Sequence, residues 1–484
     1  MMEMAKAYSH LAYIQDSIPK PRKKPSRSAS GVVVVAVMCK PMKCPKSEPC
    51  IFCPGGPGSV FGDTPQSYTG LEPAARRAAQ AGFDPRAQVA HRIRQLEEIG
   101  HVPSKIELIV MGGTFLGAPK EYREWFIKEC YDAVSKSSSR TLREAILRGE
   151  HSSRRIVALT IETRPDYCRE SHVDEMLRYG CTRVEIGAQA LRDDLLEATK
   201  RGHSRQDIID AIRVAKDAGL KVVLHMMPGL PGSTPRDDFK DFMELFENPE
   251  LRPDGLKIYP TLVLKGTKLY EMWERGEYQP YTLEEHVNLL AQVKAIIPRY
   301  VRIYRIQRDI PSNLIVDGVK KSNLRQIVQE YMGKLGLRCM CIRCREVGRV
   351  SSPPHPSLLE LKVMEYEASG GIEMFLEVTG PEDQLVGFLR LRIPSDKAHR
   401  SELSQGDIAV VRELRVYGTQ IPIGHVGGWQ HRGVGLWLMR EAERIVRDEL
   451  LMRKLAVTAG VGAREYFAKL GYRKKGPYMV KLLR

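Results

Sequence analysis

Short runs of β-branched and apolar residues alternate with longer helical patterns from Gly31 to about residue 330, and this alternation restricts the fold more than any other feature. VVVVAVM at 32–38, IELIVM at 106–111 and KVVLHM at 221–226 are strand-like, whereas YREWFIKECYDAV at 122–134 is helical. Strands that are separated by helices form a parallel sheet or barrel instead of hairpins. We therefore predict an α/β domain with a parallel sheet or barrel over residues 31–330.

The pattern changes outside this region, and a length of 484 residues leaves room for more than one domain. Residues 1–30 carry basic residues between prolines and serines without an apolar period, and we predict a basic arm there. Residues 331–357 are rich in Gly, Cys, Arg and Pro, which indicates a linker with its own metal site. Residues 358–484 contain longer strands of antiparallel pattern and the helical run VGLWLMREAERIVRDEL, which predicts a separate α+β domain.

The composition excludes two classes of protein. With 43% hydrophobic residues the chain buries enough apolar surface to offset the entropy of ordering, so a disordered chain is excluded despite a formal charge of +16. The longest strongly apolar run, Val32 to Met38, is far shorter than the roughly 20 residues that span a bilayer. The N-terminal residues show no signal-peptide pattern. We therefore expect a cytoplasmic protein with reduced thiols and no membrane partner.

Seven of the ten cysteines lie in two clusters, which is typical of metal binding in a reducing compartment. Cys39, Cys44, Cys50 and Cys53 follow the first predicted strand in the segment MCKPMKCPKSEPCIFCPGG. A Pro- and Gly-rich loop at the carboxyl end of a barrel strand can bring thiolates to one point. The spacing leaves zinc and an iron-sulfur cluster open, with buried structural thiols as the remaining alternative.

The second cluster, Cys339, Cys341 and Cys344, has the spacing CxCxxC. Three thiolates need a fourth ligand to complete a tetrahedral zinc site. His355 is the nearest candidate in sequence, but sequence distance alone does not identify a ligand. We predict zinc at the three cysteines and leave the fourth ligand unnamed.

A QxxGxG pattern at Gln430, Gly433 and Gly435 opens the amphipathic helix of the last region. Unpaired amide groups at the start of a helix bind phosphate. The pattern is short, but the strand VVRELRVYG precedes it and the segment TAGVGAREYFAKLGY follows it. The three segments together favour a phosphate-containing ligand over an α+β domain without one.

Five segments of the first region resemble the radical S-adenosylmethionine (SAM) half of the Elongator catalytic subunit family. They are the cysteine-rich loop, MGGTF at 111–115, IETRPDYC at 161–168, EIGAQ at 185–189 and HMMPGLPGSTP at 225–235. The resemblance implies a partial TIM-type (β/α) barrel with a 4Fe-4S cluster and SAM, whose cleavage gives a 5'-deoxyadenosyl radical. It implies that Cys39 is not a ligand. The implied positions are Cys44, Cys50 and Cys53 for the cluster, Cys339, Cys341 and Cys344 for zinc, and Gly112 and Gly113 for close approach to the cofactor.

The last region resembles the GNAT (Gcn-related) acetyltransferase fold, in which a strand edge and a glycine loop bind acetyl-CoA. Family members carry two adjacent tyrosines in the final motif, and here the pair is Tyr466 and Phe467. The resemblance further implies that Lys105 contacts acetyl-CoA and that Lys257 lies near the active site, so that Lys105, Lys257 and Tyr466 are the predicted catalytic residues. The other implied acetyl-CoA contacts are Glu413, Leu414, Arg415, Val416, Gln430, Gly433, Val434, Gly435, Leu436 and Phe467.

Members of this family act on transfer RNA (tRNA), so the resemblance implies carboxymethylation at carbon five of the wobble uridine, with acetyl-CoA as carbon donor. It also implies tRNA as partner, with either a homodimer or a larger Elongator assembly. The net positive charge fits a polyanion. The segment 299–308 alternates arginines with Tyr300 and Tyr304, which we expect to stack on unpaired bases, with a solvated basic face as the alternative.

Two rival functions remain open from the sequence. A protein lysine acetyltransferase would use the first cysteine cluster only as a structural metal site and needs a general base, for which Glu413 is the candidate. A non-enzymatic, zinc-stapled RNA-binding scaffold leaves the QxxGxG domain unexplained. Only the radical enzyme requires a redox-active cluster.

Overall fold

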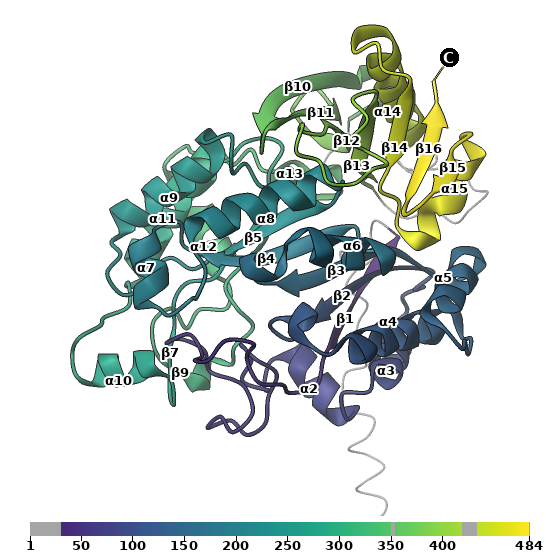
Figure 1. The fold of residues 1–484 in the computed structure, drawn as a ribbon. Coiled ribbons are helices and arrows are strands. Elements are labelled where there is room, and N and C mark those ends of the chain that lie inside the picture. The colour runs from purple at the N-terminus through teal and green to yellow at the C-terminus, as the bar shows by residue number, and fades with distance from the viewer. Residues whose placement is uncertain (1–30, 350–353, 419–432, 484) are drawn as a thin grey trace, which may run out of the picture.

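Two seven-stranded sheets form the frame of the molecule in the computed structural model, which describes residues 31–349, 354–418 and 433–483 (Figure 1). The predicted basic arm and Gln430 lie outside these residues. In the first sheet every neighbouring pair is parallel, in the order β1-β2-β3-β4-β5-β6-β8. The prediction of a parallel α/β architecture is therefore confirmed, as a half-barrel. Its strands are β1 (Val32–Met38), β2 (Lys105–Met111), β3 (Arg155–Thr163), β4 (Arg183–Gln189), β5 (Lys221–Met226), β6 (Gly255–Ile258) and β8 (Arg302–Ile306).

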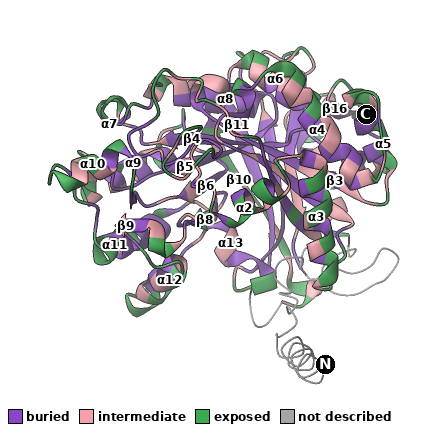
Figure 2. Cartoon of the chain, turned by 90° about the horizontal axis from the view of Figure 1, so that it is seen from below, coloured by how far each residue is buried: buried purple, intermediate pink, exposed green. Residues whose placement is uncertain are grey.

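Helices cover the outside of the half-barrel, and their exposed faces surround buried strands (Figure 2). The strands are rich in Val, Ile and Leu because parallel strands are covered on both faces. Several helices begin at a side chain that accepts an amide hydrogen bond, such as Ser204 at α8 and Thr282 at α11. The main helices are α2 (Pro73–Gln80), α3 (Pro85–Glu98), α4 (Lys120–Ser135), α5 (Leu142–His151), α6 (Glu170–Arg178), α7 (Asp193–Ala198), α8 (Arg205–Asp217), α9 (Pro235–Glu247), α10 (Lys268–Glu274), α11 (Leu283–Ile296), α12 (Leu324–Lys334) and α13 (Ile342–Arg345).

The second sheet is mixed, in the order β10-β11-β12-β13-β14-β16-β15. Neighbouring strands from β10 through β13 are antiparallel, as the sequence predicts, whereas β13 and β14 are parallel. The predicted long helix is α14 (Val434–Arg444), which continues as a π-helical turn over Ile445–Glu449. The other elements are β10 (Glu360–Ala368), β11 (Gly371–Thr379), β12 (Leu385–Ile393), β13 (Ile408–Val416), β14 (Lys454–Val457), α15 (Arg464–Lys469), β15 (Arg473–Lys475) and β16 (Tyr478–Leu482).

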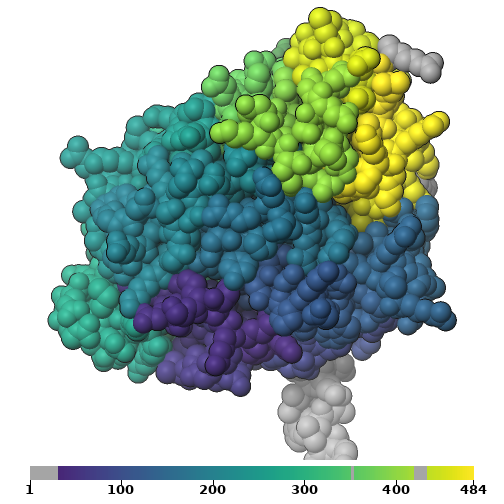
Figure 3. All heavy atoms as spheres, in the orientation of Figure 1, coloured from purple at the N-terminus to yellow at the C-terminus, as the bar shows by residue number. Residues whose placement is uncertain are grey.

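The C-terminal region, green to yellow in Figure 3, packs directly on the half-barrel region, and its contacts with residues at the start of β3 and just before β6 place it at the amino ends of the strands. Arg412 of β13 donates to both oxygens of Asp254, which precedes β6, at 2.6 and 2.8 Å. It also donates to Glu373 at 2.8 Å, and all three side chains are buried. Arg392 pairs in the same way with Asp217 at 2.6 Å. Paired buried charges therefore join the two sheets at this end.

A short antiparallel pair, β7 (Val263–Leu264) with β9 (Ile315–Asp317), lies beside the half-barrel. Among the described residues, no helix has the length and apolar character needed to cross a bilayer. The carboxyl ends of the half-barrel strands, opposite the second sheet, remain accessible for a site.

Candidate active site

A cavity of about 150 Å³ lies at the carboxyl ends of the half-barrel strands. This is the end where parallel α/β sheets and barrels carry their sites, because loops from several strands meet there. Six strands, β2 to β6 and β8, and the loop after β1 contribute to its walls. The residues that line it include Cys50, Cys53, Tyr68, Gly113, Glu162, Gln189, Arg201, His225, Lys257, Tyr259, Arg305 and Arg308.

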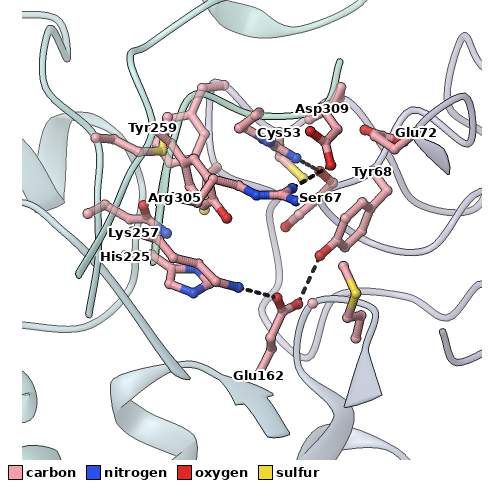
Figure 4. Close-up of a pocket in the computed structure, with 18 of the residues that line it drawn as sticks. Cys53, Ser67, Tyr68, Glu72, Glu162, His225, Lys257, Tyr259, Arg305 and Asp309 are labelled. Carbon is pink, nitrogen blue, oxygen red and sulfur yellow. Dashed lines mark hydrogen bonds and ion pairs between the residues drawn. The ribbon is translucent and has the colours of Figure 1, made fainter. Parts of the chain in front are cut away.

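Lys257 of β6 is the centre of a charged cluster in this cavity. Its ammonium group donates to Glu185 and lies 3.4 Å from Glu162. His225 Nε2 lies 3.2 Å from Glu185, and the Tyr68 hydroxyl donates to Glu162 at 2.8 Å (Figure 4). Burial alone would lower the pKa of Lys257, but Glu185, with Tyr259 and Glu162, raises it above its ordinary value. Lys257 is therefore a cation held between two carboxylates.

The ligand atoms of Glu162, Glu185 and His225 lie within 4.8 Å of one another, a spacing that could hold a metal ion. The Lys257 ammonium group bonds with both carboxylates and already supplies a positive charge there. The sequence motifs contained all three residues, but sequence analysis assigned no role to them. The signal available was a charged residue near the end of each apolar strand.

Cys50 and Cys53 face the cavity, whereas Cys44 does not line it. Arg201 Nη1 donates to Cys50 Sγ at 3.1 Å, and Lys46 Nζ lies 3.5 Å from the same sulfur. Burial raises the pKa of Cys50, but Arg201 and Lys46 outweigh burial and lower it below the ordinary value. At Cys50 the protein therefore favours the thiolate, which is the form that binds metals.

The three predicted cluster ligands are not gathered around a single point. Of the groups of three within 4.8 Å among the described residues, none combines Cys44, Cys50 and Cys53. A single zinc ion needs such convergence, whereas in an iron-sulfur cluster each cysteine binds a different iron atom. The arrangement therefore fits a cluster better than one zinc ion.

Cys39 and Gly112 pack against each other beside this loop. A Cβ atom on Gly112 would lie 2.3 Å from Cys39 Sγ, and burial raises the pKa of Cys39 to about 12. Cys39 is thus a buried thiol, and its expected lack of a metal stays a prediction. Gly113 has a φ of +85° and lines the cavity, whereas Gly112, with a φ of +123°, makes room for Cys39. Only one of the two predicted glycines therefore faces the site.

Lys105 lies at the other end of the half-barrel. It is the first residue of β2, a strand of seven residues that spans roughly 20 Å. Burial, followed by the charge of Arg155, lowers its pKa. A Cβ on Gly462 would lie 2.3 Å from Arg155 Cβ, so this end of β2 and β3 meets the turn before α15. Lys105 and Lys257 therefore belong to different ends of the molecule.

Several residues predicted to bind acetyl-CoA lie where β13 extends beyond the end of its pairing with β14. The pairing of the two strands ends at Val411 and Val457, and the later residues of β13 pair with β12 alone among the described strands. Gly433, with a φ of +83°, precedes α14, so Val434, Gly435 and Leu436 form the first helical turn. A Cβ on Gly435 would lie 3.3 Å from the Tyr466 hydroxyl and within 4.0 Å of Val416 and Leu414.

Glu413, Arg415 and Phe467 point away from this gap. Glu413 accepts a hydrogen bond from Arg390 at 3.1 Å, and Arg415 lies 3.8 Å from Glu107 of the half-barrel. Burial raises the pKa of Glu413, but Lys221, Arg390 and Arg415 together lower it. Phe467 is buried and meets Tyr466 edge to face. Burial of the phenyl ring explains why a hydroxyl group is not needed at this position.

The second cysteine cluster is compact. The sulfurs of Cys339, Cys341 and Cys344 lie within 4.8 Å of one another, and the described residues provide no fourth ligand in that group. His355, the nearest candidate in sequence, instead contacts Ser357 Oγ at 2.7 Å through Nδ1. The three thiols fit a single zinc ion.

The expectation of an exposed base-stacking surface is wrong for Tyr300, and Tyr304 is half-buried. Tyr300 is buried and stacks on Tyr366 with ring centroids 4.0 Å apart. Tyr304 lies beneath the Arg183 guanidinium, 4.7 Å away. Tyr300 precedes β8 and Tyr304 lies within it, and the alternation of residue types did not reveal these contacts. Arg299 and Arg302 pair with carboxylates of other segments, whereas Arg305, which pairs with the nearby Asp309, and Arg308 line the cavity.

Comparison with known proteins reveals similarity along almost the whole chain. The Radical SAM superfamily matches residues 42–246, and the Radical_SAM C-terminal domain matches residues 253–334. A tRNA uridine(34) acetyltransferase of Methanocaldococcus infernus is 52% identical over 474 residues, which cover 96% of this chain and 88% of the relative. Elongator complex protein 3 of Homo sapiens is 48% identical over 476 residues, 96% of this chain and 87% of the relative.

A solved structure matches the same extent of the fold. The archaeal Elp3 of Methanocaldococcus infernus with residues 1–46 deleted superposes with a TM-score of 0.83 at 46% identity. The match covers 94% of this chain and 100% of that chain. It therefore includes both sheets and the cavity.

Proposed function

Because the chain belongs to the radical SAM family that includes tRNA uridine(34) acetyltransferases and Elongator complex protein 3, we propose that it modifies the wobble uridine of tRNA. The finer reaction that we propose is carboxymethylation at carbon five, with acetyl-CoA as carbon donor and SAM as the source of a radical. One observation carries this proposal: Cys50 and Cys53 line the same cavity as the ion-paired Glu162 and Lys257. A redox group and a polar substrate site would thus share one chamber.

Cys44, Cys50 and Cys53 would hold the 4Fe-4S cluster. When bound, the cluster and SAM supply a carbon radical that can take hydrogen from an unactivated methyl group. The protein favours the Cys50 thiolate through Arg201, and Gln66 donates to Cys53 Sγ at 2.9 Å. These donors fit sulfur ligands that carry negative charge, because such ligands accept hydrogen bonds.

The charged cluster in the cavity would orient the substrates. Lys257 would offer an ammonium group to carboxylate or uracil oxygens, and the Glu162 carboxylate would accept hydrogen bonds from amino or hydroxyl groups. Arg308, and Arg305 with its partner Asp309, line the cavity wall, where the two arginines would attract tRNA phosphates.

The second sheet would bind acetyl-CoA as a GNAT-type domain. The unpaired edge of β13 presents backbone groups to a pantetheine arm, and the first turn of α14 presents free amides to the pyrophosphate. Tyr466 beside Gly435 would contact the ligand. In this proposal Lys105, at the end of β2 nearest the second sheet, contacts acetyl-CoA. Zinc at Cys339, Cys341 and Cys344 would stabilise the connection between the two regions.

The rival lysine acetyltransferase has weaker support. Its candidate base, Glu413, is ion-paired with Arg390, and neighbouring cations lower its pKa. A carboxylate so stabilised is a poor proton acceptor at neutral pH. The scaffold hypothesis leaves the charged cavity without a role. We therefore retain tRNA as the acceptor.

The test uses the full chain, reconstituted anaerobically and supplied with SAM, dithionite, tRNA and acetyl-CoA labelled in its acetyl carbons. Mass spectrometry of the digested tRNA should show labelled carboxymethyluridine at the wobble position. Label on protein lysines without labelled uridine would favour the lysine acetyltransferase. Binding of tRNA without transfer of label would favour the scaffold.

A further inference from the structure

Arg201 is a buried cation without a carboxylate partner. Only 6% of the residue is exposed, and no ion pair of the described residues involves its guanidinium group. Elsewhere in the structure buried arginines are neutralised: Arg164 by Asp166, Arg392 by Asp217 and Arg412 by Asp254. Burying an unpaired charge costs folding free energy, so a negatively charged partner other than a carboxylate would stabilise Arg201.

The backbone aims this cation at Cys50. Arg201 Nη2 donates to the Gly187 carbonyl at 2.6 Å, which fixes the guanidinium plane, and Nη1 donates to Cys50 Sγ at 3.1 Å. Gly187 belongs to β4, one of the rigid parallel strands. The position of the positive charge is therefore set by the half-barrel before any ligand binds.

A second cation approaches the same sulfur. Lys46 Nζ lies 3.5 Å from Cys50 Sγ and also donates to the Lys200 carbonyl, next to Arg201. The Ile51 amide donates to the Thr199 carbonyl at 3.3 Å, so the cysteine loop is fixed on the turn that carries Arg201. The two segments are far apart in sequence but form one unit around Cys50.

Cys53 has a different environment. Its sulfur accepts a hydrogen bond from the neutral amide of Gln66 at 2.9 Å. Two cationic donors at Cys50 and a neutral donor at Cys53 make the charge distribution around the thiols asymmetric. The asymmetry places the positive charge on one ligand position.

We propose that Arg201 is a positioning residue that raises the reduction potential of the iron-sulfur cluster bound through Cys50, with Lys46 contributing in the same direction. The inference rests on the proposed function, since it requires a cluster at Cys44, Cys50 and Cys53. Reduction adds one electron from a one-electron donor, such as dithionite, and thus one negative charge. Arg201 remains protonated and no proton moves. A fixed cation next to a cluster sulfur stabilises the added charge, because hydrogen bonds and local charge set such potentials.

The test compares the full chain, reconstituted anaerobically without SAM, with Arg201→Gln, Arg201→Lys and the control Lys200→Gln. Iron and sulfide content establish cluster occupancy, and an EPR-monitored redox titration gives the midpoint potential. We expect a more negative midpoint for Arg201→Gln, a smaller shift for Arg201→Lys, and no shift for Lys200→Gln. Lys200 is the matched control because its side chain pairs with Glu48 at the surface and does not contact a cysteine.

Three other outcomes would contradict the proposal in distinguishable ways. A full cluster with an unchanged midpoint in Arg201→Gln would overturn this inference alone. In a separate titration with SAM, weaker binding to Arg201→Gln together with an unchanged midpoint would assign Arg201 to the ligand instead of the cluster. A wild-type protein that takes up no iron would overturn the proposed function and this inference together. If Arg201→Gln loses the cluster, Lys46→Gln decides, because it removes the other cation at Cys50, and an unchanged midpoint there counts against the proposal.

Discussion

The two ends of the half-barrel both contain buried charges, but they use them differently. At the amino ends, Arg412 has two carboxylate partners and a backbone acceptor, all covered by the second sheet. At the carboxyl ends, the partners of Arg201 among the described residues are a sulfur and a carbonyl, and Lys257, paired with two carboxylates, also lines a cavity. Complete pairing joins two parts of a protein, whereas incomplete pairing beside a cavity leaves charge available to a ligand. Function is therefore expected at the carboxyl ends.

The largest effect is expected where the pairing is complete. Arg412→Met leaves Asp254 and Glu373 buried without their closest cation and should lower the free energy of unfolding by about 3–5 kcal/mol. Denaturant unfolding followed by two probes measures this loss. Arg453→Met is the matched control, because Arg453 pairs with Asp407 at the surface and its loss should leave stability unchanged. Equal stability of Arg412→Met and the native chain would show that the paired charges at the amino ends do not stabilise the contact between the two sheets.

Lys257→Met removes a cation from the other end. Glu162 and Glu185 would lose their shared partner, and we expect formation of modified uridine to fall about 100-fold, as when one preorganised electrostatic donor is removed. Stability should fall less than in Arg412→Met, because the cavity admits water to the carboxylates. Nucleoside mass spectrometry and unfolding measurements separate the two effects. A variant that unfolds like Arg412→Met yet retains activity when folded would contradict a functional role for Lys257.

A pair of tyrosine substitutions gives the smallest effect and the finest contrast. Tyr68→Phe removes a hydrogen bond to Glu162 in the cavity. We expect the activation free energy to rise by about 1 kcal/mol, which corresponds to about fivefold lower activity, while the free energy of unfolding stays unchanged. Tyr478→Phe removes the buried bond to the Ala218 carbonyl at the junction of the two sheets. It should lower stability by about 1 kcal/mol and leave activity unchanged. Steady-state rates and unfolding curves of both variants would reveal any reversal of this pattern.

Local sequence pattern predicted the elements but not their meeting points. The apolar runs at 32–38 and 221–226 are strands because β-branched residues suit buried parallel strands. The cysteine loop could be located in the sequence because its Pro- and Cys-rich segment begins where the apolar run of β1 ends. By contrast, Lys257 and Glu162 are 95 residues apart in the chain, and only strand order brings them together.

Side-chain direction was the other feature that the sequence did not contain. Tyr300 and Arg302 were expected at an RNA-binding surface, yet the register of β8 and the packing of the second sheet turn them inward. The sequence does not distinguish Arg201, because a single arginine after a helical segment is common. Its role depends on its partners in the fold, which among the described residues are the Cys50 sulfur and the Gly187 carbonyl.

We propose that the cavity at the carboxyl ends of the half-barrel supports radical chemistry. The most direct measurement is the formation of 5'-deoxyadenosine from SAM by the anaerobically reconstituted full chain with dithionite, acetyl-CoA and tRNA. We predict that Cys50→Ala abolishes this product, whereas Cys39→Ala, which changes a buried thiol beside the loop, retains it. Product formation by Cys50→Ala at the native rate, or a native protein that binds only zinc and cleaves no SAM, would contradict the claim.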